Sequence, residues 1–362
     1  MEEKKELLSL DKEELETLLL SLGEPRYRAE QLFVQLHRGI SLEEMTNVGK
    51  ATREKLSKVA TYHLPSVKLK LVSAIDGTVK YLFELSDGNC VESVVMKYEH
   101  GNTICISSQV GCRMGCKFCA STIGGKVRDL SPAELIGQVI AAQADTGERI
   151  SNIVMMGIGE PLDNYTNVIK FLHLVGHEKG LNIGQRHISL STCGIVPKIY
   201  ELAELDLQIT LSISLHASDD ETRSSIMPVN KSWGVDELLS ACKAYYDKTG
   251  RRISFEYTLI SGKNDSRESA LSLARLLNRH LRTRTTTMPI HVNLIPVNEV
   301  KETGFVRADD KAIRLFAKTL EEKGIRATVR RRLGADINAS CGQLRRASGA
   351  AETVGGEENH AE

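Results

Sequence analysis

Short β-forming runs alternate with helix-like stretches along most of the chain after about residue 102. The predicted strands cover residues 103–108, 152–156, 186–191, 208–214, 253–259 and 290–294. The clearest helices between them are expected over 132–144, 165–177, 235–246 and 266–281. Strands separated by helices pair in parallel through right-handed crossovers, which excludes a β-sandwich. The sequence therefore predicts an α/β fold, a partial (β/α)6 barrel whose functional groups lie at the carboxyl ends of its strands.

A small N-terminal helical domain is expected before the barrel. Asp11 and Glu14 form a capping box at the start of an amphipathic helix, and Gly23 ends that helix. A second helix is predicted from Pro25, and a third over 50–60. This domain is a candidate for docking a macromolecular partner, although its balanced charge does not support binding of a polyanion.

A β-linker is predicted between the helices and the barrel. Alternating apolar residues surround two turns, Asp76-Gly77 and Asp87-Gly88, which is typical of short antiparallel strands. The chain after Ala347 is rich in Gly, Ala and Glu, a composition that predicts disorder. The expected domains are therefore 1–66 (helical), 67–98 (linker, with Glu92), 99–346 (barrel and C-terminal loop) and 347–362 (tail).

The charge balance restricts how this chain can bind nucleic acid. Lys and Arg total 47 and Asp and Glu total 47, so the formal net charge is zero. Binding of a polyanion by overall charge is thus excluded, and any RNA-binding face must be a local patch. No apolar run approaches the roughly 18 residues of a membrane span, and the N-terminus lacks the pattern of a signal peptide. We therefore expect a cytoplasmic protein.

Three of the eight cysteines are crowded into one short segment. They are Cys112, Cys116 and Cys119, a C-x3-C-x2-C spacing directly after the first predicted barrel strand. Three thiolates can each bind one iron of a 4Fe-4S cluster, leaving the fourth iron open to a small molecule. The alternative is a zinc site built from three cysteines and a remote histidine, although zinc sites more often use paired C-x2-C spacings. Of the five cysteines outside this loop, Cys90, Cys193 and Cys242 are expected to be structural.

Small and polar residues follow several other predicted strands. These candidates for a ligand pocket are Gly159, Glu160, Ser191, Ser214, Leu215, His216 and Asn293. The glycine allows close backbone approach, and the carboxylate can accept hydrogen bonds from an ammonium group. Each of these residues taken singly is more often an ordinary loop residue, but together with the cysteine loop they favour a pocket.

The C-terminal region combines a cysteine with clustered arginines. Cys341 lies among small residues, which is compatible with either a reactive thiol or a buried apolar one. The cluster consists of Arg326, Arg330, Arg331, Arg332, Arg345 and Arg346, against the single acid Asp336. Arg279, Arg282 and Arg284 could extend it. Such a patch beside Cys341 favours phosphate contacts with RNA.

The cysteine spacing, with Phe118 before the last cysteine, resembles the radical S-adenosylmethionine (SAM) superfamily, in which the open iron holds SAM. Further segments resemble the RlmN/Cfr family within it over nearly the whole chain. These segments are 91–94, 105–112, 157–161, 214–216, 291–296 and 336–344. Asn338 and Ser340 depart from the most common form of the C-terminal motif, but Cys341 is retained.

This resemblance implies a radical SAM fold and an RNA methyltransferase that acts on an unreactive adenine carbon. The expected target is C2 of an adenosine in the peptidyl-transferase centre of 23S rRNA, and also the tRNA adenosine 3′ of the anticodon. Two alternatives remain open. One is methylation at C8, as in Cfr enzymes, and the other is a non-enzymatic metal-cluster protein that binds RNA.

The resemblance also implies a role for each candidate residue. Cys112, Cys116 and Cys119 would bind the 4Fe-4S cluster, and the seven pocket residues named above would bind SAM. Cys341 would become an S-methylcysteine intermediate, Glu92 would be the proton acceptor, and Cys105 would form a transient disulfide with Cys341. Two SAM molecules would be used in each turnover. The implied partners are 23S rRNA, tRNA and an electron donor such as flavodoxin or ferredoxin, and a monomer is expected.

Overall fold

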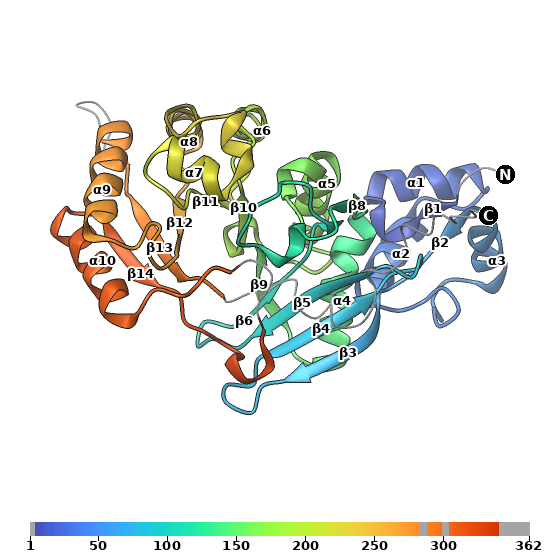
Figure 1. Ribbon diagram of the computed structural model, residues 1–362. Helices are drawn as coiled ribbons and strands as arrows, with labels where there is room; N and C mark the ends of the chain where they lie inside the picture. Colours follow the sequence, from blue (N-terminus) through green and yellow to red (C-terminus); the bar gives the residue numbers. More distant parts are fainter. Residues whose placement is uncertain (1–3, 283–287, 299–303, 340–362) are drawn as a thin grey trace, which may run out of the picture.

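The computed structural model describes residues 4–282, 288–298 and 304–339. Its main feature is one sheet with the strand order β14-β13-β12-β11-β10-β9-β6-β5-β4-β3. Figure 1 shows this sheet as a curved layer, with helices α5 to α10 along its outer side and the N-terminal helices as a separate group. The predicted α/β partial barrel is confirmed.

The N-terminal unit contains the three predicted helices, α1 (Lys12–Ser21), α2 (Tyr27–His37) and α3 (Lys50–Val59). The short strands β1 (Lys5–Glu6) and β2 (Ala60–Thr61) pair in parallel beside them, and η1 (Leu7–Ser9) links β1 to α1. The predicted capping box is present: the Asp11 carboxylate accepts from the Glu14 amide at 2.8 Å, and the Glu14 carboxylate accepts from the Asp11 amide at 2.9 Å. It satisfies two amides that would otherwise lack partners at the start of α1.

The predicted linker strands are β3 (Ser66–Val72), β4 (Val79–Glu84) and β5 (Cys90–Met96), which pair antiparallel around the two Asp-Gly turns. β5 also pairs antiparallel with β6 (Asn102–Cys105), the first barrel strand. The linker therefore continues the barrel sheet, and α4 (Pro132–Thr146) covers one face of it. Its division from the neighbouring domains stays a prediction.

Parallel pairing runs through the rest of the sheet. The strands are β6, β9 (Ile150–Met155), β10 (Ile188–Thr192), β11 (Thr210–Ser214), β12 (Ile253–Leu259), β13 (His291–Pro296) and β14 (Arg326–Val329). The sequence predicted the first six of these strands but not β14, because this short edge strand has no alternation of buried and exposed residues. The two outer strands, β14 and β3, do not pair with each other, so the described barrel is open.

Helices connect the parallel strands on the outer side of the sheet (Figure 1). They are α5 (Tyr165–Gly176), α6 (Val196–Ala203), α7 (Asp220–Ile226), α8 (Val235–Thr249), α9 (Arg267–Leu281) and α10 (Asp310–Glu322). Short elements fill the loops at the strand ends: β7 (Gln109–Gly111), β8 (Lys126–Asp129), η2 (Ala120–Thr122), η3 (Pro161–Asn164), η4 (Gln185–His187), η5 (Pro228–Lys231) and η6 (Ala335–Ile337). No helix in the described ranges is long and apolar enough to cross a membrane.

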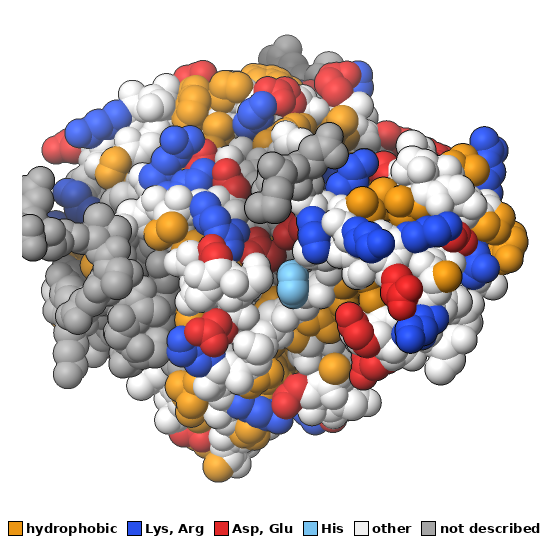
Figure 2. Space-filling model, turned by 90° about the vertical axis from the view of Figure 1, so that its right-hand side faces the viewer, with side chains coloured by type: hydrophobic (Ala, Val, Ile, Leu, Met, Phe, Trp, Pro, Cys, Tyr) orange, Lys and Arg blue, Asp and Glu red, His pale blue; other side chains and the backbone are white. Residues whose placement is uncertain are grey.

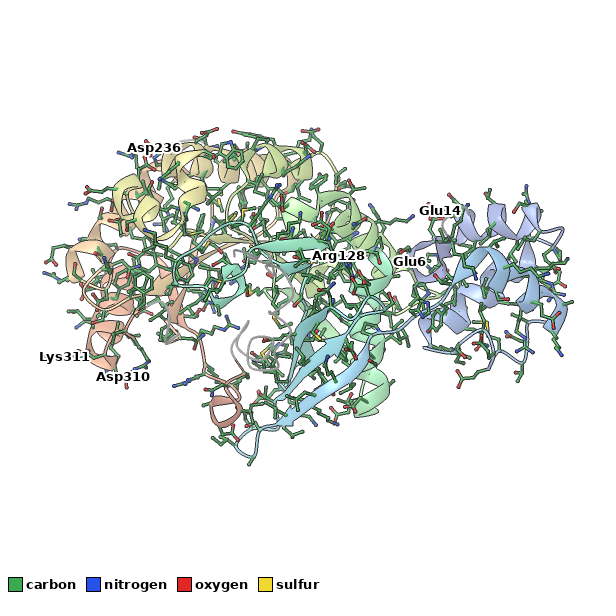
Figure 3. All side chains as sticks on the ribbon, turned by 45° about the vertical axis from the view of Figure 1, so that its right-hand side comes forward. Glu6, Glu14, Arg128, Asp236, Asp310 and Lys311 are labelled. Atoms are coloured by element: carbon green, nitrogen blue, oxygen red, sulfur yellow. The ribbon has the colours of Figure 1, made fainter. Side chains whose placement is uncertain are left out.

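Polar and aromatic contacts join the N-terminal unit to the barrel. Glu14 of α1 forms a 2.7 Å ion pair with Lys170 of α5, and Figure 3 shows Glu14 at the side of the unit that faces the barrel. The rings of Phe33 and His177 lie 4.6 Å apart across the same junction. On the face shown in Figure 2, acidic and basic side chains are interspersed, which agrees with the zero net charge of the sequence.

Candidate active site

The cysteine loop begins immediately after β7 and folds tightly on itself. Gly111 has a φ of 76°, and a Cβ there would lie 2.0 Å from the carbonyl oxygen of Gly125, so only glycine fits. The Cys112 amide donates to that carbonyl at 3.0 Å, and the Cys119 amide donates to the Cys116 carbonyl at 3.1 Å. These contacts bring the three predicted ligands together on one compact loop.

The surroundings of this loop are apolar. Cys116 belongs to a cluster of buried residues that includes Cys193, Ile226 and Met227. Burial raises the pKa of Cys112 to about 12, and the charges of Glu160 and Cys119 act in the same direction. Without metal the Cys112 thiol is therefore protonated at neutral pH, so binding of iron by Cys112 would release a proton.

The donor set fits the cluster that the sequence predicts. Within the described ranges, no three His, Cys, Asp or Glu side chains lie close enough together to hold a single metal ion. A 4Fe-4S cube has a different requirement, because each thiolate binds its own iron. Three thiols in an apolar setting on one loop meet that requirement.

The loop after β9 packs directly against the segment leading into the cysteines. Gly159 has a φ of 109°, and a Cβ there would lie 2.7 Å from the amide nitrogen of Gln109. The Gln109 side-chain oxygen in turn accepts a hydrogen bond from the Glu160 amide at 2.9 Å. The sequence analysis expected Gly159 to allow close approach of the backbone to a ligand. In the structure, Gly159 instead allows close approach to the backbone of Gln109.

Glu160 has a buried carboxylate that joins its own loop to the loop after β10. One oxygen accepts from the Leu162 amide at 3.0 Å, and the other accepts from the Cys193 amide at 2.7 Å. Burial raises the pKa of Glu160, while these hydrogen bonds oppose that shift. A carboxylate has about four acceptor sites, so Glu160 can still accept from an ammonium group.

Three other predicted pocket residues lie on the parallel strands β10, β11 and β13. Ser191 is on β10, Ser214 ends β11, and Asn293 is on β13, and all three are half-buried. Glu256 of β12 lies between them, because it pairs in register with Ser214 on one side and with Asn293 on the other. The polar side chains therefore form a row across three strands.

Glu256 is a site residue that the sequence analysis missed. Its carboxylate is buried and accepts from the Asn293 side-chain nitrogen at 2.7 Å and from the Ser254 hydroxyl at 3.0 Å. Burial raises its pKa. A carboxylate inside the apolar run of a central strand was the signal that could have identified it, since an unpaired carboxylate is costly to bury.

His216 follows Leu215 at the end of β11 in a left-handed backbone conformation, with a φ of 59°. Its Nδ1 accepts from the Thr258 amide at 2.9 Å, so the proton of the neutral ring lies on Nε2. Burial lowers the pKa of His216 to about 3, and the charge of Arg223 contributes to the shift. His216 is therefore a neutral, fixed ring at the edge of the pocket.

Arg223 is a second residue that the sequence analysis missed. It is fully buried, and its guanidinium donates to the carbonyls of Leu215 at 3.0 Å, Ser214 at 3.0 Å and Cys193 at 2.6 Å. It also donates to the Asn230 side chain at 2.9 Å. A single side chain thus fixes the loops that follow β10 and β11, where pocket residues are predicted.

The linker strands place two further candidates together. Tyr81, Phe83 and Val91 belong to the main core on one face of the sheet. Side chains alternate between the two faces along a strand, so Glu92, which follows Val91 on β5, lies on the other face. Cys105 of β6 pairs with Val94 and shares that face.

Residues shortly before Cys341 cover this second face. Cys105 belongs to an apolar cluster with Val94 and Met96, and Leu333 and Ala339 pack against it. Cys341 itself lies outside the described residues, as do Arg284, Arg345 and Arg346. Arg326, Arg330, Arg331 and Arg332 are exposed. The seven cysteines in the described ranges are unbridged.

Comparisons with known proteins agree with this arrangement. Residues 5–61 match the ribosomal RNA large subunit methyltransferase N-terminal domain, and residues 106–274 match the radical SAM superfamily. The probable dual-specificity RNA methyltransferase RlmN of Clostridium acetobutylicum is 54% identical over 94% of this chain and 96% of its own. That of Clostridium novyi is 52% identical over 94% and 98%.

A solved structure is similar over the same extent. A radical SAM methyltransferase from Sphaerobacter thermophilus covers 94% of this chain and 98% of its own, with 40% identity and a TM-score of 0.87. The zinc-site and non-enzymatic alternatives are thus not supported, since this family uses a 4Fe-4S cluster and SAM. The chain belongs to the RlmN family of radical SAM RNA methyltransferases.

Proposed function

We propose that this enzyme methylates C2 of an adenosine in 23S rRNA and of an adenosine in tRNA. The observation that supports this most directly is the shared sheet face on which Glu92 and Cys105 meet the segment leading to Cys341. The dual-specificity name of the relatives supports both RNA classes, and the RlmN name favours C2 over C8.

Cys112, Cys116 and Cys119 would hold the cluster, and the row of polar groups at the strand ends would hold SAM. Glu160 would accept hydrogen bonds from the amino group of SAM, next to the cysteine loop. Ser191, Ser214, Leu215, His216 and Asn293 would line the rest of the pocket. When bound, the cluster and SAM would supply a 5′-deoxyadenosyl radical, which a site closed to water would protect from side reactions.

Adenine C2 is an electron-poor carbon whose hydrogen is barely acidic, so it cannot attack SAM as a nitrogen nucleophile would. The Cys341 thiolate would first take a methyl group from one SAM, which makes it the carbon carrier. With the cofactors bound, the radical they supply would remove a hydrogen atom from this S-methyl group, so that the carbon can bond to adenine C2. The adduct would give one electron back to the cofactor, and the Glu92 carboxylate would accept the C2 proton. The Cys105 thiolate would then attack the sulfur of Cys341 and break its bond to the transferred carbon, which takes up a proton to become the methyl group. The two sulfurs would be left as a transient disulfide that an external reductant resets.

The RNA would approach from the exposed arginine cluster. Arg326, Arg330, Arg331 and Arg332 are all exposed on or just after the edge strand β14, where they could bind phosphates beside the carrier loop. An adenine in structured RNA must also be unstacked before its C2 can enter the pocket. The N-terminal unit is proposed as an additional docking domain.

The remaining parts of the proposal concern the setting of the reaction. The chain would act in the cytoplasm as a monomer and would receive electrons from a flavodoxin or ferredoxin. Its proposed domains are 1–66, 67–98 and 99–346, with a tail over 347–362.

Nucleoside analysis of RNA treated with the reconstituted enzyme tests the proposal. We expect 2-methyladenosine, and finding only 8-methyladenosine would reject C2 specificity. Cys341→Ala should abolish methylation while the cluster stays bound, because Cys341 is not a cluster ligand in this proposal. Cys242→Ala, which changes a cysteine buried in the core, is the matched control and should keep activity.

A further inference from the structure

Lys80 of β4 is a fully buried lysine beside the proposed proton acceptor. Its Nζ lies 3.0 Å from the Glu92 carboxylate, and the exposed fractions of the two side chains are 0% and 2%. Lys80 pairs in register with Val94, so Glu92 is its diagonal neighbour on the adjacent strand. A buried ion pair is seldom the most stabilising choice for a protein interior, which makes another role for it worth seeking.

The same ammonium also reaches the C-terminal segment. Lys80 Nζ donates to the Asn338 carbonyl at 3.1 Å, a contact between residues 258 positions apart in sequence. Asn338 lies three residues before Cys341 and has a left-handed φ of 45°. One buried charge therefore contacts both the proton acceptor and the segment that leads to the methyl carrier.

The turn between β3 and β4 fixes this segment at two further points. The Asp336 carboxylate accepts from the Ser73 hydroxyl at 2.7 Å and from the Ala74 amide at 2.9 Å. The Asp76 carboxylate accepts from the Gly334 amide at 2.9 Å. Residues 334–338 are thus attached to the hairpin that carries Lys80, and of these hydrogen bonds the one from Lys80 lies nearest in sequence to Cys341.

We propose that Lys80 is a positioning residue that holds the Glu92 carboxylate and residues 334–338, which lead to Cys341, in register for proton removal from the RNA adduct. This inference rests on the roles of Glu92 and Cys341 in the proposed function. Proton transfer requires the base within hydrogen-bond reach of the proton it takes. Fixing both groups through one ammonium satisfies that requirement without contact between Lys80 and the substrate.

Variants of Lys80 separate this role from simple support of the fold. Lys80→Met removes the charge at similar length, Lys80→Arg keeps it, and Glu92→Gln removes the acceptor. Lys68→Met is the matched control, because Lys68 forms an exposed pair with Glu84 at 2.7 Å on the same hairpin. Each variant would be assayed with a transcribed 23S rRNA fragment for S-methylation of Cys341 and for breakdown of the covalent protein–RNA adduct.

We expect Lys80→Met to slow adduct breakdown by about 100-fold, the scale of a general-base contribution, while Cys341 methylation changes by less than about threefold. Lys80→Arg should restore most of the lost rate, and Lys68→Met should match the wild type. Lys80→Met combined with Glu92→Gln should break down the adduct no more slowly than Glu92→Gln alone, since Lys80 would act through Glu92. The proposal would be overturned if the two substitutions slowed adduct breakdown by the product of their separate effects. It would also be overturned if Lys80→Met broke down the adduct at the wild-type rate.

A measurement that needs no turnover completes the test. Amide hydrogen exchange across residues 334–339 should become faster in Lys80→Met than in Lys68→Met, and unchanged exchange would contradict the link to the Cys341 loop. A wild-type enzyme that forms no methylated RNA would instead reject the proposed function, whatever the exchange result. If Lys80→Met fails to fold, Lys80→Arg and the charge-neutral double variant decide the question.

Discussion

The ring of Phe118 meets the ring of His216 edge-on, with centroids 5.0 Å apart and an interplanar angle of 83°. Phe118 belongs to the cysteine loop, and His216 follows the fourth parallel strand, β11. The contact therefore joins the proposed cluster ligands to the proposed SAM pocket. Because Thr258 fixes the His216 ring through Nδ1, the aromatic pair has one rigid partner.

Replacing Phe118 by alanine should weaken SAM binding more than it weakens cluster binding. An aromatic pair contributes about 0.5–1.5 kcal/mol beyond the area it buries, so the Kd for SAM should rise by about three- to tenfold. Iron content should stay near wild type, because the thiols remain in place. Equilibrium binding of SAM to the reconstituted protein provides the measurement. Phe118→Leu keeps apolar bulk without the ring, so its Kd for SAM should lie between those of the wild type and of Phe118→Ala. An unchanged Kd in both variants would contradict the coupling between the cysteine loop and the SAM pocket.

Glu160→Gln should weaken the binding of SAM, even though it replaces only one oxygen by an NH₂ group. The carboxylate accepts from two backbone amides, those of Leu162 and Cys193, and a glutamine side chain has only one acceptor oxygen. One amide would then face an NH₂ group, and a lost hydrogen bond to a charged partner is worth about 1.5–3 kcal/mol. We expect SAM affinity to fall by about 10- to 100-fold, measured by calorimetry. Glu204→Gln, an exposed control, should have no effect, and equal affinities in the two variants would count against Glu160 as a ligand.

Local patterns predicted the ends of two strands correctly, whereas the first predicted strand, 103–108, ends at Cys105 in the structure. The strand predicted over 253–259 coincides with β12, and the predicted end at 214 is also the end of β11. Apolar runs and the helices between them set these limits, and neither depends on distant contacts. Ser214 ends β11 as expected, whereas Asn293 lies within β13 and not after it, and the roles of these residues stay predictions.

The residues that the sequence analysis missed are buried by contacts with residues far away in the sequence. Lys80 is buried beside Glu92 and Asn338, and Glu256 is buried beside Asn293. A lysine in a linker strand such as β4 is locally indistinguishable from one on a solvated face, so the burial of Lys80 becomes evident only when the sheet register is known. Arg223 was missed for a similar reason, since it donates mainly to backbone carbonyls, which leave no trace in a side-chain pattern.

Arg223→Met should destabilise the protein by about 3 kcal/mol or more. The substitution leaves the carbonyls of Cys193, Ser214 and Leu215 buried without this donor, and an unsatisfied buried group costs about 1–3 kcal/mol. Urea denaturation of the cluster-free protein provides the measurement. Arg275→Met, an exposed position in the middle of α9, is the matched control and should change stability by less than about 0.5 kcal/mol. Similar stabilities for the two variants would show that Arg223 does not support the strand-end loops.

The stability of the N-terminal junction should depend on pH through His37. Burial lowers the pKa of His37 from 6.5 to about 4, and the neighbouring His177 acts in the same direction. The unfolded chain therefore binds a proton that the folded protein does not, so the stabilising effect is complete above pH 6.5 and is lost as the pH falls toward 4. Within this window, each unit of falling pH should lower the free energy of unfolding by about 1.4 kcal/mol. Between pH 6.5 and pH 5, the free energy of unfolding of His37→Gln should fall by about 2 kcal/mol less than that of the wild type, as measured by urea titration. Parallel curves for the two proteins would contradict a neutral, buried His37.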